Sequence, residues 1–244
     1  MRRTLWIALL GAVVFVAVVI VRMPIEWIIP ASGTVGSCAS LEGSLWSGSC
    51  AGLVVRGTPV GDVSWSLRPW RLFVGKLAVH LNLRRATATA SADVELGMGE
   101  SVTAHDVVAD APLDSGLIPG IPQTLHGRAH VELALAQVRR GIITQLQGRI
   151  EARDLEDRST ADTPLGSYLV TFPGGSGEPT GKLRDLDGPL ALEGTLRLTP
   201  QPGFELEGLI APRRGAPPEL VNNIRFLGSP DAAGRRPFSM TGTF

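Results

Sequence analysis

The stretch LEGSLWSGSCAGLVVRGTPVGDVSWSLRPWRLFVGKLAVHLNL, residues 41–83, contains short alternating apolar segments separated by glycines. Trp46, Trp65 and Trp70 stand about one strand and one turn apart within it. Glycine adopts the backbone angles that tight turns require, and alternation of apolar with polar residues is typical of a half-buried strand. The stretch therefore predicts an antiparallel β meander with large aromatic side chains docked on one face.

The rest of the chain keeps the same period of two. Apolar residues alternate with polar ones at 86–96, 129–135 and 190–198, and a proline-containing loop at 114–122 separates the first two segments. Consecutive strands of this kind build an antiparallel sheet with one dry and one solvated face. The last segment provides a candidate apolar groove on the dry face, formed by Leu190, Leu192, Leu196 and Leu198.

A short element with a glycine after an apolar and a polar residue recurs along the chain. It reads LEGSLWSG from 41, LQGRIEA from 146, LEGTLRLTP from 192 and FELEGLIAP from 204. A glycine within a strand usually marks a bulge or a bend, so we expect these positions to curve the sheet. The element resembles the long curved meanders of bacterial envelope proteins of the AsmA and TamB class.

One helical signal stands out beyond the N-terminal region. Pro217 and Pro218 precede ELVNNIRFLG, in which Leu220, Ile224 and Leu227 share a helical face. Proline is favoured at the first helical positions, and a glycine commonly follows the end of a helix. We expect one short helix at 217–227 that packs against the sheet, followed by a final strand at 238–244.

The N-terminal residues 5–21, LWIALLGAVVFVAVVIV, carry no charge. A run of this length is at the lower limit for a helix that spans a bilayer. Arg2 and Arg3 precede it, so the positive-inside rule places the N-terminus in the cytoplasm. A cleaved signal peptide is the alternative, although charged and bulky residues stand where small ones normally precede a cleavage site. The expected membrane anchor includes Leu5, Trp6, Ile7 and Val21.

This topology divides the chain into three parts. Residues 1–22 form the cytoplasmic start and the anchor, 23–36 a juxtamembrane linker, and 37–244 a β-rich periplasmic domain. The two cysteines, Cys38 and Cys50, both fall in the third part. An even number of cysteines in an oxidising compartment favours a disulfide over free thiols.

The composition excludes one class of partner and supports the fold class. Lysine and arginine total 23 and aspartate and glutamate total 23, so the formal net charge is +0. Proteins that bind nucleic acid neutralise phosphates with an excess of basic residues, and we expect no nucleic-acid partner. The 29 glycines and 18 prolines favour a turn-rich β protein over a helical bundle.

The titratable residues do not form a recognisable catalytic or metal-binding motif. His126 and His130 are four residues apart, but on a strand that spacing corresponds to about 13 Å, too far to share one ion. Carboxylates in ARDLEDRSTAD, residues 152–162, alternate with arginines as in a solvated turn. FPGGSG at 172–177 lacks the GK[ST] ending of a phosphate loop. We expect neither an enzyme nor a bound cofactor or metal.

Both ends of the chain resemble one known family. GSLWSG followed by SWSLRPWRLFVGKL, and the closing FLGSPD, AAGRRPF and GTF, are similar to the type II secretion system protein N family, also called general secretion pathway protein N. Residues 86–187 carry little of this signal. The resemblance implies structural roles for Gly43, Trp46, Gly48, Trp65, Pro69 and Gly75.

The resemblance also implies a function. It indicates a single-pass protein of the bacterial inner membrane whose periplasmic domain is a non-enzymatic accessory or scaffold subunit. Its partners would be the platform proteins of the inner membrane and the secretin of the outer membrane, so that it links the two in protein export. A periplasmic lipid carrier is the alternative, because a sheet with one apolar face either packs against a second layer or binds an apolar ligand such as phospholipid.

Overall fold

The computed structural model describes residues 36–55, 57–69, 71, 77–97, 99–113, 124–159, 163–175, 177–201 and 203–243. It forms two compact units, Met1–Arg85 and Ala86–Phe244. The expected anchor, most of the linker, Trp70, Gly75 and the loop at 114–122 lie outside the described residues. Among the residues that are described, no helix has the length and apolar character needed to cross a membrane.

The first unit is an antiparallel meander, as the tryptophan-containing stretch predicts. Its strands are β1 (Gly36–Ser37), β2 (Ser40–Gly43), β3 (Ser47–Val55), β4 (Thr58–Leu67) and β5 (Leu77–Arg85). β1 and β2 both pair with β3, which pairs with β4, and β4 pairs with β5. The first edge of this unit therefore consists of two short strands with an interruption between them.

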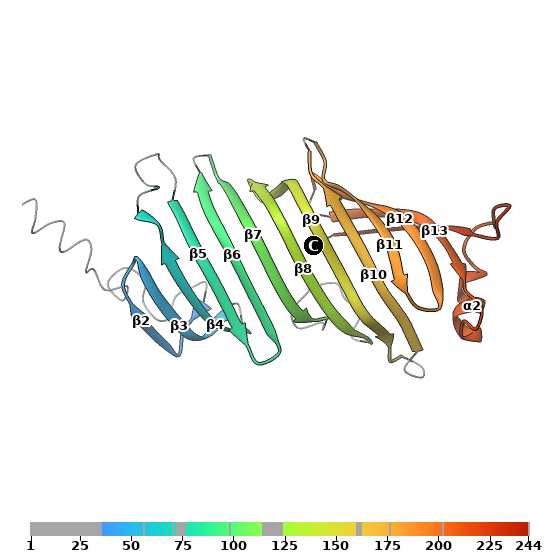
Figure 1. Cartoon of the computed structure of the whole chain (residues 1–244), viewed down its shortest axis with the longest axis horizontal. Coiled ribbons are helices and arrows are strands. Elements are labelled where there is room, and N and C mark those ends of the chain that lie inside the picture. Colours follow the sequence, from blue (N-terminus) through green and yellow to red (C-terminus); the bar gives the residue numbers. More distant parts are fainter. Residues whose placement is uncertain are drawn as a thin grey trace, which may run out of the picture. The chain divides into compact units, whose positions relative to one another are not determined.

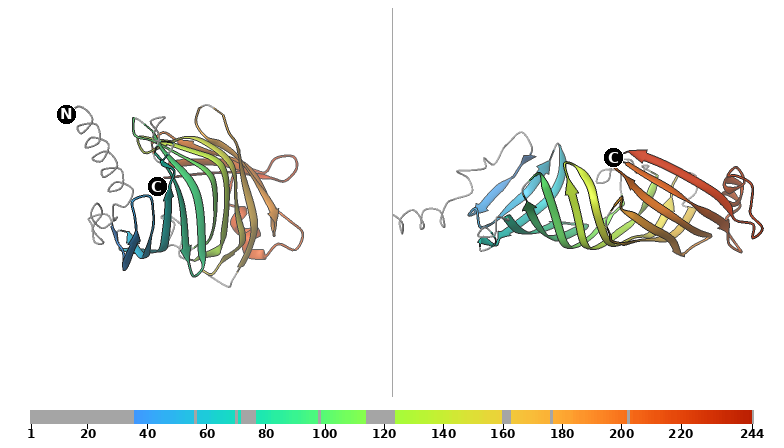
Figure 2. Two further views of the ribbon diagram at one scale, coloured as in Figure 1. Left: turned by 60° about the vertical axis from the view of Figure 1, so that its left-hand side comes forward. Right: turned by 90° about the horizontal axis from the view of Figure 1, so that it is seen from above.

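The second unit continues the antiparallel pattern, and each strand pairs with its neighbour in sequence (Figure 1). Its strands are β6 (Ala88–Gly97), β7 (Ser101–Pro112), β8 (Leu125–Arg139), β9 (Ile142–Asp157), β10 (Thr163–Pro173), β11 (Thr180–Asp187), β12 (Leu190–Thr199), β13 (Gly203–Pro212) and β14 (Arg236–Thr243). These strands form one curved layer, as two further views show (Figure 2). The mainly β, antiparallel fold class is thus confirmed.

The predicted helix is present as α2, Pro218–Ile224. Ile224 is buried against Leu190 and Ile210 of the sheet, and Leu220 and Leu227 pack around them. The face of this helix that sequence spacing identified is therefore the face that contacts β12 and β13. The helix ends at Ile224, with Arg225 as its C-cap, before it reaches the glycine at 228 that the sequence suggests as its stop.

Two local expectations are wrong. The strand expected from residue 86 begins at Ala88, because Ala86 and Thr87 form the turn after β5. The carboxylates at 152–157 lie in β9 and not in a turn, since this segment pairs with β8 on one side and β10 on the other. Leu155, in the middle of the charged run, is buried with Leu113 and Ala129, and its burial accounts for the longer strand.

The sheet of the second unit has no second sheet against it among the described residues, so it buries apolar surface within its own layer. Phe172 is the most buried large side chain, with 2% of its surface exposed. Buried side chains gather in three separate clusters: Leu113, Ala129 and Leu155; Leu146, Phe172 and Leu198; and Leu190, Ile210 and Ile224.

In both units, aromatic rings also lie on glycines of the adjacent strand. A methyl group built on Gly48 would lie 2.5 Å from Trp65, its cross-strand partner. The same arrangement joins Phe172 to Gly181, at 2.8 Å. β13 and β14 contain it twice, with Phe238 on Gly208 at 2.8 Å and Phe204 on Gly242 at 2.5 Å. Glycine is required at these positions because any side chain would occupy the volume of the ring.

The recurring glycine element has more than one structural role. Gly148, with φ +140°, lies beside a register shift between β8 and β9, as a bulge-forming glycine should. Gly194 and Gly208 are instead direct partners in an unbroken ladder between β12 and β13, without a bulge. A methyl group on Gly194 would lie 2.6 Å from the carbonyl oxygen of Glu207. These two glycines allow close approach of the strands.

We expect Gly208→Ala to lower the free energy of unfolding by about 1–3 kcal/mol, because the added methyl group collides with the Phe238 ring and with backbone. Urea unfolding followed by tryptophan fluorescence measures the effect. Ser239→Ala is the matched control, since Ser239 is exposed next to Phe238 on the opposite face of β14. Equal stability of the two variants would contradict the role given to the ring.

A disulfide joins Cys38 to Cys50, with Cα atoms 5.6 Å apart. Cys38 lies in the interruption between β1 and β2, and Cys50 is buried in β3. The adjacent N–H of Ala39 donates to the carbonyl of Ala51 at 2.9 Å. The bond therefore fastens the interrupted first edge to the strand behind it, as the cysteine count predicts.

Replacing both cysteines with serine should lower the free energy of unfolding of the first unit by roughly 3 kcal/mol, the chain-entropy value for a loop of this size. Unfolding in denaturant with and without reductant measures it. Reductant should destabilise the wild type to the same extent and leave the double variant unchanged. Two alkylatable thiols in native, unreduced protein would contradict the bond itself.

Candidate interaction surfaces

The four leucines expected to form an apolar groove all lie on β12, but they separate into two groups. Leu198 is buried with Leu146 and Phe172, and Leu196 packs beside them. Leu190 is buried near α2, and Leu192 packs beside it. Gly194 stands between the two pairs. The apolar face therefore has two filled regions with a narrow strip at Gly194 between them, beside the Phe238 ring that covers Gly208.

Much of this apolar face stays partly open. Leu192 and Leu196 are only half buried, as are Val170 and Ile150 on neighbouring strands. At the far end of the face, the hydroxyl of Tyr168 donates to the carbonyl of Leu165 at 2.7 Å. Burial raises the pKa of Tyr168 to about 12, so this hydroxyl is a donor at neutral pH. The face offers apolar contact surface with few polar groups.

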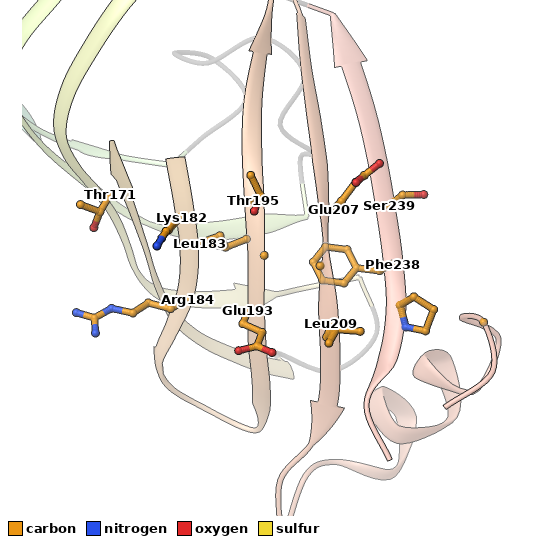
Figure 3. A pocket seen from close by; sticks show the side chains of 14 residues that line it. Thr171, Lys182, Leu183, Arg184, Glu193, Thr195, Glu207, Leu209, Phe238 and Ser239 are labelled. Carbon is orange, nitrogen blue, oxygen red and sulfur yellow. The ribbon is translucent and has the colours of Figure 1, made fainter. Parts of the chain in front are cut away.

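The opposite, polar face contains an open depression of about 1140 Å³ over β10 to β14. Figure 3 shows its side chains in two rows that follow the strand register. One row contains Lys182, Thr195, Glu207 and Ser239, and the other Arg184, Glu193 and Leu209. Glu193 also forms an ion pair with Arg235 at 2.5 Å. The depression is lined by two cationic side chains, Lys182 and Arg184, and two anionic ones, Glu193 and Glu207. Such mixed charge is better suited to contact with a polar protein surface than to binding a single charged ligand.

A chain of ion pairs joined through one histidine, called here the ion-pair chain, crosses the polar face of β7, β8 and β9. It runs in the order Arg128, Asp110, His130, Glu132, Arg149, Glu151 and Arg153. His130 at its centre lies 3.5 Å from Asp110 and 3.1 Å from Glu132. Sequence reasoning missed this chain, although charges spaced two apart in HVE (130–132) and RIEAR (149–153) place them on one face of two neighbouring strands.

The ion-pair chain stabilises the ionised form of Glu132. The hydrogen bond with His130 lowers the pKa of Glu132 from its ordinary value of 4.5, and the charge of Arg149 lowers it further against the effect of desolvation. His126 lies on the same strand, but it does not join His130 in a common site. Among the described residues, no three histidine, cysteine, aspartate or glutamate side chains come together to hold a metal ion.

Phe226 is the most exposed large apolar side chain that the structure describes, with 90% of its surface in solvent. It lies in the turn after α2, between inward-facing Ile224 and Leu227. The guanidinium of Arg236 donates to the carbonyls of Leu227 at 3.1 Å and Gly228 at 2.8 Å, and so fixes this turn. The sequence signal for its exposure is that Phe226 departs from the helical spacing of its apolar neighbours.

The residues to which the family resemblance assigns structural roles lie in the first unit, apart from Gly75, which is not described. Gly43, with φ +106°, precedes the turn that holds Trp46. The N–H of Leu67, the last residue of β4, donates to the carbonyl of Trp46 in that turn at 2.6 Å. Gly48 and Trp65 form the ring-on-glycine pair described above, and Pro69 is exposed after β4. The described residues of this set thus lie in or next to β2, β3 and β4, and their structural roles stay a prediction.

Comparison with known proteins supports the resemblance at both ends of the chain. The sequence model of a family described as type II secretion system (T2SS), protein N, matches residues 37–239. The chain belongs to this family. Type II secretion system protein N of Vibrio cholerae serotype O1 (strain ATCC 39315 / El Tor Inaba N16961) is 26% identical over 252 residues, which cover 99% of each chain.

A second member of the protein N family, from Aeromonas hydrophila, is 24% identical over 262 residues, again with 99% of each chain covered. The alignment of the present chain with both relatives extends across the segment at 86–187, where sequence motifs alone gave little signal. No solved structure matches the chain.

The ion-pair chain predicts a pH dependence of stability. Because the folded-state pKa of Glu132 is lowered, its contribution is complete above its unfolded value of 4.5 and is lost as the pH falls through the folded value. Glu132→Gln should therefore reduce the loss of stability between about pH 5 and pH 3, measured by urea unfolding across this range. Glu178→Gln is the control, because Glu178 is exposed and is not a member of the ion-pair chain. Parallel profiles for wild type and Glu132→Gln would contradict the assignment.

Proposed function

We propose that this chain is a non-enzymatic scaffold subunit of the type II secretion pathway that links the inner-membrane platform proteins to the outer-membrane secretin. The observation that carries the proposal is membership of the protein N family, with a match over residues 37–239. Relatives named as type II secretion system protein N align over 99% of the chain. The scaffold acts through surface contacts and uses no cofactor.

The proposed location is the bacterial inner membrane, with the C-terminal domain in the periplasm. Residues 1–22 would provide the cytoplasmic start and the anchor, 23–36 the linker, and 37–244 the periplasmic domain. The Cys38–Cys50 disulfide supports this location, because disulfides persist in oxidising compartments such as the periplasm. The uncharged run at 5–21 and the preceding arginines support the orientation.

Two surfaces of the second unit are suited to contact with other proteins. Phe226 is displayed on a turn that Arg236 holds in place, and a rigid exposed aromatic is the usual anchor of a protein interface. The depression beneath Lys182, Thr195 and Glu207 offers mixed charges, which are typical of a polar interface rim. Neither surface needs a rearrangement of the sheet in order to bind.

A second candidate is a lipid-binding or lipid-transfer role, and one observation favours it. The apolar face of the second unit is not covered by another sheet among the described residues, and Leu192 and Leu196 remain half exposed. Such a face could shield the acyl chains of a phospholipid. Partial filling by the two leucine groups around Gly194 limits this to the open strip between them.

Photo-cross-linking in intact cells tests both candidates. A photoreactive residue is placed at 195, 196 or 226 of the full chain. In a separate experiment, the gene is deleted and the cells are assayed for a defect in type II secretion. Thr195 and Leu196 are adjacent but face opposite sides of the sheet, so each is the control for the other. We expect platform proteins or secretin in the products from 195 or 226. Phospholipid adducts at 196 alone, with no secretion component at any position, would replace the scaffold with the lipid carrier.

A further inference from the structure

The last strand of the sheet has an open and unprotected edge. In the part of the chain that is described, β14 pairs with β13 alone, through eight consecutive partners without a register shift. Natural sheets protect such edges with charges, prolines, bulges or very short strands, and β14 has one proline, Pro237, next to its first residue. Residues 237–243 contain no charge, and Arg236, at the start of the strand, directs its guanidinium to the turn after α2.

The edge formed by β1 and β2 in the first unit differs from that of β14 in its length and its continuity. It is divided into β1 and β2, which contain two and four residues. A disulfide from Cys38, within the interruption, fastens it to β3. A short, interrupted strand is a poor template for pairing. Of these two edges, that of β14 is therefore the better template for another strand, from Phe238 to Thr243, since Pro237 has no N–H to donate.

The sequence of β14 identifies the strand that fits this edge. β13 contains Phe204, Leu206 and Gly208, and β14 contains Phe238, Met240 and Gly242 at the same spacing. The two strands pair antiparallel, with each phenylalanine opposite the glycine of the other strand and Leu206 opposite Met240. The pattern Phe-x-Leu/Met-x-Gly is thus complementary to itself when two such strands run in opposite directions.

We propose that two copies of this chain associate by antiparallel pairing of β14 with β14. The two-fold axis passes perpendicular to the sheet at Met240, so that Met240 faces its own copy and Phe238 lies opposite Gly242 of the second copy. A rotation about such an axis keeps each face on its own side, so polar residues meet polar and apolar meet apolar. In each copy the Phe204 ring already covers Gly242 and the Phe238 ring already lies on Gly208, so the pairing leaves these contacts in place, and Gly242 presents no side chain of its own to Phe238 of the second copy.

The exposure of Met240 supports this pairing. This side chain is 56% exposed in the middle of the edge, on the same face as the Phe238 ring. Pairing with a second copy places two methionines in contact across the axis, as Leu206 and Met240 are placed between β13 and β14. The two curved sheets would then join, with one apolar face continuous across both copies.

Cysteine cross-linking of the full chain in membranes tests the pairing and its register. The two native cysteines are bonded to each other, so a single introduced cysteine is the only free thiol. We expect Met240→Cys to give a disulfide-linked dimer on mild oxidation. Coexpressed Ser239→Cys and Thr241→Cys chains should cross-link more than either alone, because residues 239 and 241 are opposite in this register. Thr195→Cys, exposed two strands away on β12, is the control and should stay monomeric.

A second variant tests the association without oxidation. The wild-type chain in detergent should have twice the mass of the monomer by light scattering, and Met240→Lys should be monomeric, because two like charges then face each other across the axis. Thr195→Lys adds the same charge away from the edge and should remain dimeric. The proposal is overturned if the wild type is monomeric and Met240→Cys forms no dimer. It is also overturned if Met240→Cys cross-links only to another protein, or if Thr195→Cys forms as much dimer as Met240→Cys.

Discussion

The second unit depends on aromatic rings that lie flat on cross-strand glycines. A sheet with one layer has no opposite sheet to receive its large side chains, so a ring that stood upright would expose most of its surface to water. When Phe238 lies on Gly208 and Phe204 on Gly242, each ring instead covers the backbone of the neighbouring strand. At about 25 cal/mol for each Å² of apolar surface removed from water, these contacts replace part of a missing core.

This arrangement also determines which surfaces stay available for binding. Rings and leucines fill the apolar face in patches, and the narrow strip at Gly194 is left between two of them. On the polar face, ion pairs such as Arg149 with Glu132 at 2.5 Å hold long side chains against the sheet. Under the proposed function, partners would meet the turn of Phe226, which the Arg236 guanidinium holds, and the mixed charges of the depression.

The sequence predicted those features that depend on local spacing and failed where they depend on register. Period-two alternation identified the strands, and the spacing of Leu220, Ile224 and Leu227 identified α2 and its buried face. The pairing of Gly194 with Gly208 could not be predicted, because only the alignment of β12 with β13 shows that the two glycines are opposite. The ion-pair chain needed the same information, since its charges come from three strands.

The strand order has a consequence for how the chain is made. In the second unit every strand pairs with its neighbour in sequence, so no strand must wait for a distant partner, and such local pairing favours fast folding. During synthesis the N-terminal strands emerge first, and the sheet can grow one hairpin at a time. Each incomplete chain then exposes the unpaired edge of its most recently added strand. In the described sheet, the strand added last is β14.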